Sequence, residues 1–220
     1  MMQRGTTRLA VGMVVVAVVV AGLMVVLSQL GGGGGSQDVF AGIPQDGTRL
    51  GEEDAPVTIR LYEDFQCPAC AQFARETLPE VVERHVEPGE AKLVSETLAF
   101  LGPDSVSTAR AAIAAGEQDR YWQYAFLLFQ NQGAENSGYA TEEFLTNLAE
   151  ETQDLDVSEW DEARGEDLVE EELNAVQTKA NEDGVNSTPT LVISGPEGER
   201  KLRGAVPMEE IEKAIEEVKG

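Results

Sequence analysis

The chain has 220 residues, of which 42% are apolar, enough to bury one core but too few for two compact domains of average size. All 40 acidic residues lie after residue 36, with only 14 of the 16 lysines and arginines, so this part carries a formal charge of −26. Because phosphate binding needs the opposite sign, the composition argues against nucleic acid as a partner.

The N-terminal residues predict a membrane anchor. Residues 9–27 are a charge-free run of 19 residues that follows Arg4 and Arg8. A helix of about 20 such residues spans a bilayer, whereas the apolar stretch of a signal peptide has about 7 to 15. We expect an uncleaved anchor, with residues 1–8 in the cytoplasm and the later chain outside, because positive side chains stay on the cytoplasmic side. Cleavage at Val39-Phe40-Ala41 is the alternative.

Residues 28–47 are predicted to be a flexible linker, since Gly31–Gly35 have no side chains to pack. The outer domain then covers residues 48–220. The run 57–62 is rich in β-branched residues and predicts a central strand. A helix should begin at Pro68, which suits the first helical position, and should be kinked by Pro79.

Residues 91–100 predict a second strand, and about 103–184 predict a block of helices. Its first helix has an apolar stripe of Val106, Ala109, Ile113 and Ala114, and Asp104 and Thr141 stand where N-caps belong. Strand character returns at 190–193, followed by a hairpin turn over 194–198, a return strand over 199–204 and a last helix from Pro207. The order predicts an α/β core interrupted by a helical insertion.

Cys67 and Cys70 are the only cysteines of the chain, and three interpretations compete for them. A zinc site needs four ligands, and His85 is the only other soft ligand. A structural disulfide would close too small a loop to constrain the unfolded chain much. Redox chemistry is favoured, because Cys67 at the N-cap could accept from the N–H groups of Ala69 and Cys70 and face the helix dipole, which lowers its pKa.

This placement makes Cys67 the predicted nucleophile. Cys70, one turn further along, is the more shielded thiol and can attack a mixed disulfide formed at Cys67. A second signal is Thr188-Pro189, directly before a strand. A cis bond there would leave the backbone of Thr188 free to bind an extended peptide beside Cys67.

Two segments carry a family resemblance: LGEEDAPVTIRLYEDFQCPAC at 50–70 and GVNSTPTLVISG at 184–195. Together they resemble the DsbA-like branch of the thioredoxin superfamily, above all its membrane-anchored bacterial and archaeal members, over about residues 48–220. The resemblance implies a thioredoxin fold with a helical insertion and a cis-proline loop at Thr188-Pro189 that binds substrate. It also implies a Cys-Pro-Ala-Cys redox centre at 67–70 that works without metal or other cofactor, with Pro68 and Ala69 tuning it.

The sequence departs from relatives of this branch at two positions. Many of them carry a buried acid six residues before the first cysteine, where this chain has Leu61. Glu63 and Asp64 are near, but strand alternation should point only one of them inward. The most oxidising relatives have His at the position of Ala69, so we predict a less oxidising couple than theirs.

The resemblance implies thiol-disulfide exchange on secreted proteins, most often as a disulfide donor. A membrane quinone-linked thiol oxidase is the implied partner for recycling, because the chain has no third cysteine. The alternatives are a reductase or isomerase using the same centre, and a membrane-anchored peptide-binding or chaperone module in which the cysteines are incidental.

Overall fold

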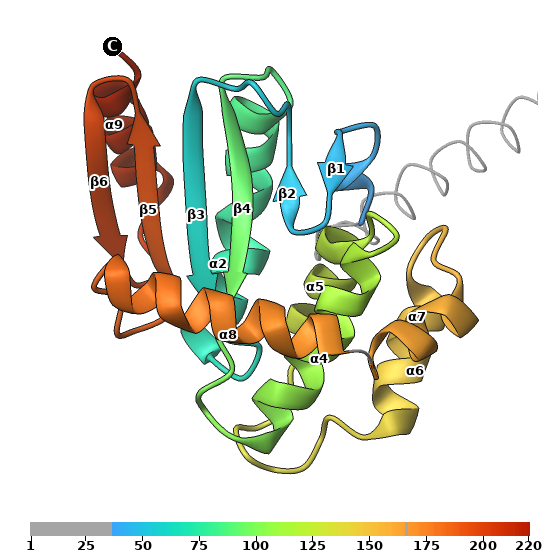
Figure 1. The fold of residues 1–220 in the computed structure, drawn as a ribbon. Coiled ribbons are helices and arrows are strands. Elements are labelled where there is room, and N and C mark those ends of the chain that lie inside the picture. Colours follow the sequence, from blue (N-terminus) through green and yellow to red (C-terminus); the bar gives the residue numbers. More distant parts are fainter. Residues whose placement is uncertain (1–36, 166) are drawn as a thin grey trace, which may run out of the picture. The chain divides into compact units, whose positions relative to one another are not determined.

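A computed structural model of the chain describes residues 37–165 and 167–220 (Figure 1). The predicted anchor over 9–27 and the glycine run lie outside these residues. Within the described ranges, no helix has both the length and the apolar character needed to cross a membrane.

Residues 37–47, assigned to the linker from the sequence, contain secondary structure and pack against the domain. Residues Gln37–Phe40 form a 3₁₀ turn, η1, and the ring of Phe40 is 1% exposed. It packs against Trp122 and Phe126, with ring centroids 6.1 and 5.7 Å away. An apolar ring at the end of the predicted linker therefore ties residues 37–47 to the core.

A six-stranded sheet forms the centre of the domain. Its strands are β1 (Gln45–Asp46), β2 (Arg49–Leu50), β3 (Val57–Glu63), β4 (Ala91–Thr97), β5 (Thr190–Gly195) and β6 (Gly198–Arg203). They lie in the order β1-β2-β4-β3-β5-β6, with β3 and β4 parallel and every other pair antiparallel. The predicted strands at 57–62, 91–100, 190–193 and 199–204 are all confirmed, although β4 ends at Thr97.

The helices are α2 (Pro68–Glu76), α3 (Leu78–Val81) with the π-helical turn η2 (Val82–Val86), α4 (Pro103–Gly116), α5 (Tyr121–Gln130), α6 (Glu142–Glu151), α7 (Val157–Ala163), α8 (Asp167–Glu182) and α9 (Met208–Lys219). In Figure 1, α2 and α9 lie behind the sheet and α8 crosses in front of it. The helical insertion between β4 and β5, α4 to α8, is thus confirmed.

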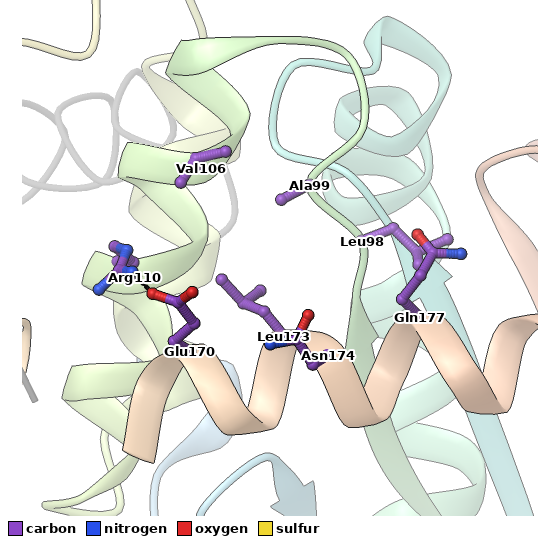
Figure 2. A pocket seen from close by; sticks show the side chains of 8 residues that line it. All are labelled: Leu98, Ala99, Val106, Arg110, Glu170, Leu173, Asn174 and Gln177. Atoms are coloured by element: carbon purple, nitrogen blue, oxygen red, sulfur yellow. Dashed lines mark hydrogen bonds and ion pairs between the residues drawn. The ribbon is translucent and has the colours of Figure 1, made fainter. Parts of the chain in front are cut away.

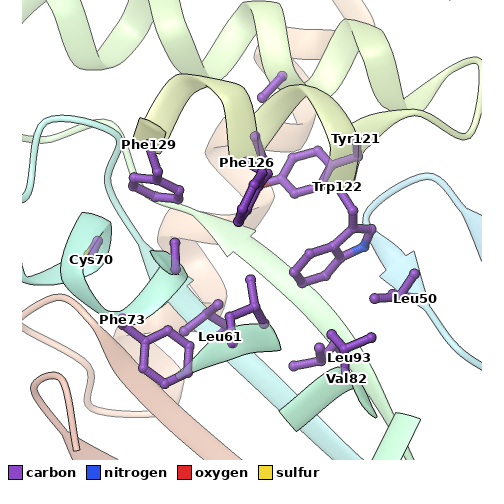
Figure 3. Packing of buried hydrophobic residues seen from close by; sticks show 14 of the residues in the cluster. Leu50, Leu61, Cys70, Phe73, Val82, Leu93, Tyr121, Trp122, Phe126 and Phe129 are labelled. Carbon is purple, nitrogen blue, oxygen red and sulfur yellow. The ribbon is translucent and has the colours of Figure 1, made fainter. Parts of the chain in front are cut away.

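Strand alternation decides which core each side chain joins. Leu61 and Leu191 are fully buried in the main core on the α2 and α9 side. Tyr62 and Val192, one residue further along, belong to the smaller cluster beneath α8 with Val176. Figure 3 shows the main core, where aromatic rings of α5 pack over Leu61 and Cys70.

The first helix breaks earlier than predicted. The sequence indicated one helix kinked at Pro79, but α2 ends at Glu76 and α3 starts at Leu78 with Pro79 in its first turn. Pro79 has no N–H to donate to the carbonyl of Arg75 and fits best near a helix start, so one helix ends and a new one begins there.

Candidate active site

The cysteines stand where the central strand passes into the first helix. β3 ends at Glu63, and α2 begins at Pro68, with Cys67 as its N-cap at φ −75° and ψ 116°. The N–H of Cys67 donates to the carbonyl of Asp64 at 2.9 Å, which closes the turn between the two elements. The predicted placement of Pro68 as first helical residue and Cys67 as N-cap is confirmed.

The two thiols are free and differ in their surroundings. Cys67 is 8% exposed and Cys70 is fully buried. The Cys70 thiol donates to the sulfur of Cys67, and this is the largest cause that lowers the pKa of Cys67 to about 6, against the opposing effect of burial. Burial first, and then the contact with Cys67, raise the pKa of Cys70 well above its usual range.

Helix capping contributes less to this pKa than predicted. Within the described helix, the sulfur of Cys67 accepts no capping hydrogen bond of normal geometry. The N–H groups of Cys70 and Ala69 still lower the pKa of Cys67, but they rank behind the Cys70 thiol and the Thr188 side chain. The thiolate is therefore stabilised mainly by its partner thiol and less by the start of the helix.

The loop before β5 closes over the sulfur from the other side. The Thr188–Pro189 bond is cis, as the resemblance implied. The sulfur of Cys67 lies 3.4 Å from the carbonyl oxygen of Thr188, although the two residues are 121 positions apart. Two bonds hold the loop: Thr190 Oγ1 donates to the Ser187 carbonyl at 2.7 Å, and the N–H of Gly204 donates to the Pro189 carbonyl at 2.8 Å.

Both acids after Leu61 are buried, so the prediction that only one points inward is wrong. Glu63 is 2% exposed and Asp64 is fully buried. Alternation holds only inside a strand, and Asp64 lies one residue beyond the end of β3. Its carboxylate accepts from the N–H groups of Gln66, Phe100 and Leu101 at 2.8 to 3.2 Å and from the Ser105 hydroxyl at 2.6 Å.

Glu63, two residues after Leu61, is a buried acid near the cysteines. Burial is the main cause that raises its pKa to about 7, and the nearby charge of Cys67 adds to the rise. The Ser95 hydroxyl donates to Oε1 at 2.8 Å and the Tyr121 hydroxyl lies 3.3 Å from the same atom. The signal in the sequence was an acid directly after the predicted strand 57–62; Ser95 and Tyr121 carried none.

Two further side-chain predictions are wrong. Asp104 is not the cap of α4, because Gly102 holds that position and Pro103 opens the helix. The carboxylate of Asp104 is buried and accepts from the N–H of Gly138 at 2.8 Å. Val106, assigned to an apolar stripe, is 40% exposed.

Val106 instead borders a hollow of about 280 Å³ between α4, α8 and the segment after β4 (Figure 2). Leu98, Ala99 and Leu173 supply further apolar lining, and Arg110 pairs with Glu170 across it at 2.7 Å. Neither cysteine lines this hollow. Among residues 37–165 and 167–220, no group of three or more His, Cys, Asp or Glu could hold a metal ion.

A thiolate-forming cysteine at a helix start, a buried partner thiol and a cis-proline loop facing them define the site of a thioredoxin-fold protein. A family model described as thioredoxin matches residues 45–217. The chain therefore belongs to the thioredoxin family.

Known relatives narrow the assignment. The "Probable disulfide bond formation protein D" of Bacillus anthracis is 29% identical over 149 residues, which are 66% of this chain and 69% of that protein. The crystal structure of oxidised BdbD from Bacillus subtilis has a TM-score of 0.69 at 22% identity, covering 79% of this chain and 95% of that one.

Chlamydia trachomatis DsbA has a TM-score of 0.67 at 24% identity, covering 77% of this chain and 89% of that one. Because both identities are below 25%, these two structural similarities support the fold alone. Together with the family model and the relatives named as disulfide bond formation proteins, these structures identify the chain as a DsbA-like thiol:disulfide oxidoreductase.

Proposed function

We propose that the domain donates disulfides to protein thiols outside the cytoplasm, with Cys67 as the reacting sulfur. The observation that supports this direction best is the contrast between the two thiols: the pKa of Cys67 is lowered to about 6, while that of Cys70 is raised. A stabilised Cys67 thiolate favours the reduced protein, and a couple whose reduced form is stabilised is an oxidant.

The reaction proceeds by two exchanges. A substrate thiolate attacks the sulfur of Cys67 in the Cys67–Cys70 disulfide; that bond breaks, and Cys70 leaves and takes up a proton. A second substrate thiolate then attacks the substrate sulfur of the mixed disulfide and expels Cys67 as a thiolate. The substrate loses two electrons to the protein, and the low pKa of Cys67 makes it a good leaving group.

Three other residues serve this chemistry. Thr188 and Pro189 bind the substrate backbone, since the Thr188 loop lies against the reacting sulfur. Glu63, whose pKa of about 7 leaves it partly protonated at neutral pH, supplies the proton that Cys70 takes up. Its charge also raises the pKa of Cys70, so the two buried groups are electrostatically coupled.

The location of the reaction follows from the N-terminal segment. Residues 9–27 anchor the chain, residues 28–36 tether the domain, and the domain acts on the outer side of the membrane. Reduced Cys67 and Cys70 then need an external oxidant, and a quinone-linked thiol oxidase of the same membrane fits this role. Pro68 and Ala69 set a potential below the oxidising extreme of the family, because a methyl group offers no charge to the thiolate.

The test uses the full-length chain in detergent, oxidised beforehand, mixed with a reduced unfolded protein that has two thiols. We expect the substrate to gain one disulfide per molecule of protein reduced, and Cys67→Ser and Cys70→Ser to abolish the transfer. A reductase would instead leave this substrate reduced and open substrate disulfides when supplied with electrons. The peptide-binding alternative would be established if the wild type transferred no disulfide and Cys67→Ser still suppressed aggregation of the unfolded substrate.

A further inference from the structure

The turn that carries Cys67 lies between a strand and a helix and depends on side chains for support. Residues 64–67 belong to neither β3 nor α2. The carbonyl groups of Phe65 and Cys67 accept hydrogen bonds from the connection between α5 and α6, residues 131–141, which belongs to the helical insertion. Buried backbone carbonyls need such donors, so the source of these hydrogen bonds decides the shape of the turn.

Gln132 supplies two of these bonds with one amide. Its Nε2 donates to the carbonyl of Phe65 at 2.8 Å and to the carbonyl of Cys67 at 3.1 Å. The Tyr139 hydroxyl donates to the Phe65 carbonyl at 3.3 Å. The side chain of Gln66, in turn, accepts from the N–H of Asn136 at 2.6 Å. Every residue of the turn from Phe65 to Cys67 is therefore bonded to the same connection.

The connection is itself built to hold this arrangement. The side chain of Tyr139 lies so close to Gly133 that a Cβ at residue 133 would clash with it. The same ring packs edge-on against Phe144 of α6, with centroids 5.3 Å apart. Gln132 is thus fixed between the end of α5 and a packed aromatic pair, although the residues around it, 134 to 138, are exposed.

The orientation of the Cys67 sulfur depends on this turn, because helix capping alone holds the sulfur only weakly. The sulfur accepts no capping hydrogen bond of normal geometry from the described helix. Its stabilising neighbours, the Cys70 thiol and Thr188, act only if the backbone of Cys67 keeps its extended conformation. The Cys67 carbonyl also accepts from the N–H of Ala71 at 3.1 Å, so losing the Gln132 amide would loosen the turn without unfolding the helix.

We propose that Gln132 is a positioning residue for Cys67, whose amide holds the turn between β3 and α2 so that the sulfur faces Cys70 and Thr188. A neutral amide suits this task, because it donates to two carbonyls without adding a charge beside the thiolate. The inference rests on the proposed role of Cys67 as the reacting sulfur. It gives the helical insertion a part in the reactivity of the redox centre.

The test measures the pH dependence of alkylation at Cys67 in the reduced full-length chain in detergent, for wild type and Gln132→Leu. Only the thiolate reacts, so the midpoint of the profile reports the pKa of Cys67. We expect Gln132→Leu to raise the midpoint by about half a pH unit or more, which lowers the rate at pH 6 about twofold. Gln132→Asn keeps the amide on a side chain that is one methylene too short, and it should shift the midpoint by the same amount.

Two matched variants separate positioning from general loosening. Asn131→Ala alters the exposed neighbour, whose amide donates to Leu127 instead, and should leave the profile unchanged. Tyr139→Phe removes a bond to Phe65 but leaves the Cys67 carbonyl held, and should shift the midpoint less than Gln132→Leu.

An unchanged midpoint in Gln132→Leu, with equal losses of thermal stability in the oxidised and reduced forms, would show a merely structural role and overturn the inference. An equal shift of the midpoint in Tyr139→Phe would also overturn the inference, because the bond from Gln132 to the Cys67 carbonyl would then not be the cause of the shift. A wild type that transfers no disulfide refutes the proposed function instead, whatever Gln132 does to the titration.

Discussion

Around the cysteines, single residues create large differences in ionisation over short distances. Cys67 and Cys70 are three positions apart, yet the pKa of one is lowered to about 6 and that of the other is raised, because Cys67 accepts from the Cys70 thiol, whereas burial in the core dominates at Cys70. Leu61, Glu63 and Asp64 also differ from one another: Leu61 is a core side chain, burial raises the pKa of Glu63, and the side chain of Asp64 accepts from backbone N–H groups of two segments.

Glu63→Gln tests the buried acid by its effect on stability. The pKa of Glu63 in the folded protein, about 7, lies above its ordinary value of 4.5. Ionising this carboxyl is therefore harder in the folded state, and the wild type loses stability as the pH rises from about 4.5 to 7. The amide cannot ionise, so the variant should be more stable at pH 8 by up to roughly 3 kcal/mol and nearly equal to wild type at pH 4.

Urea unfolding of the oxidised forms at both pH values measures this difference, and oxidation removes the thiolate of Cys67 from the comparison. Glu87→Gln, on an exposed carboxyl, is the control and should show no such pH dependence. If wild type and Glu63→Gln were equally stable at pH 8, the carboxylate would be ionised in the fold without cost, and its proposed protonation near neutral pH would be refuted.

At the level of elements, the periodicity of apolar residues predicted the longer strands and most helices. It failed for segments that are too short to show a pattern. β1 and β2 have two residues each, too short for any alternation to register. The π-helical turn and the break before Pro79 depend on local backbone geometry that a stripe of apolar residues does not encode.

Within the site, the cysteine pair and Thr188–Pro189 were predictable because each is a local pattern with a chemical reason. Tyr121 and Gln132 were not, since both reach the centre from the helical insertion, where no spacing relates them to the cysteines. The fold alone brings them there: α5 packs over α2 in the main core, and its C-terminal end meets the turn before Pro68.

The insertion's smaller helices depend on their caps, which provides a test of its stability. The Thr141 hydroxyl accepts from the N–H of Phe144, as predicted, and Asp156 accepts from the N–H groups of Ser158 and Glu159. Thr141→Ala and Asp156→Ala should each cost about 1 kcal/mol of unfolding free energy. Thr141→Ser, which keeps the capping oxygen, should restore most of that loss. An alanine variant as stable as wild type would contradict this account of α6 or α7.

For the whole molecule, the arrangement explains how distant parts of the chain serve one sulfur. Arg60 of β3 pairs with Asp183 after α8 at 3.3 Å, and the Tyr62 hydroxyl donates to the same carboxylate at 2.6 Å. These contacts fix the end of the insertion against the sheet, five residues before Thr188. The redox centre is thus assembled from the sheet, the insertion and the loop that returns from it.

A disulfide donor must be kept oxidised in living cells, so the redox state of Cys67 and Cys70 there decides whether this centre works as one. Thiols are trapped in intact cells by rapid acidification and alkylation. The reduced and oxidised forms of the full-length chain are then separated by the mass that the alkylating group adds to the reduced form. We expect Cys67 and Cys70 to be mostly disulfide-bonded, with Cys67→Ser as the fully reduced standard. A pair found mostly reduced would contradict the donor role.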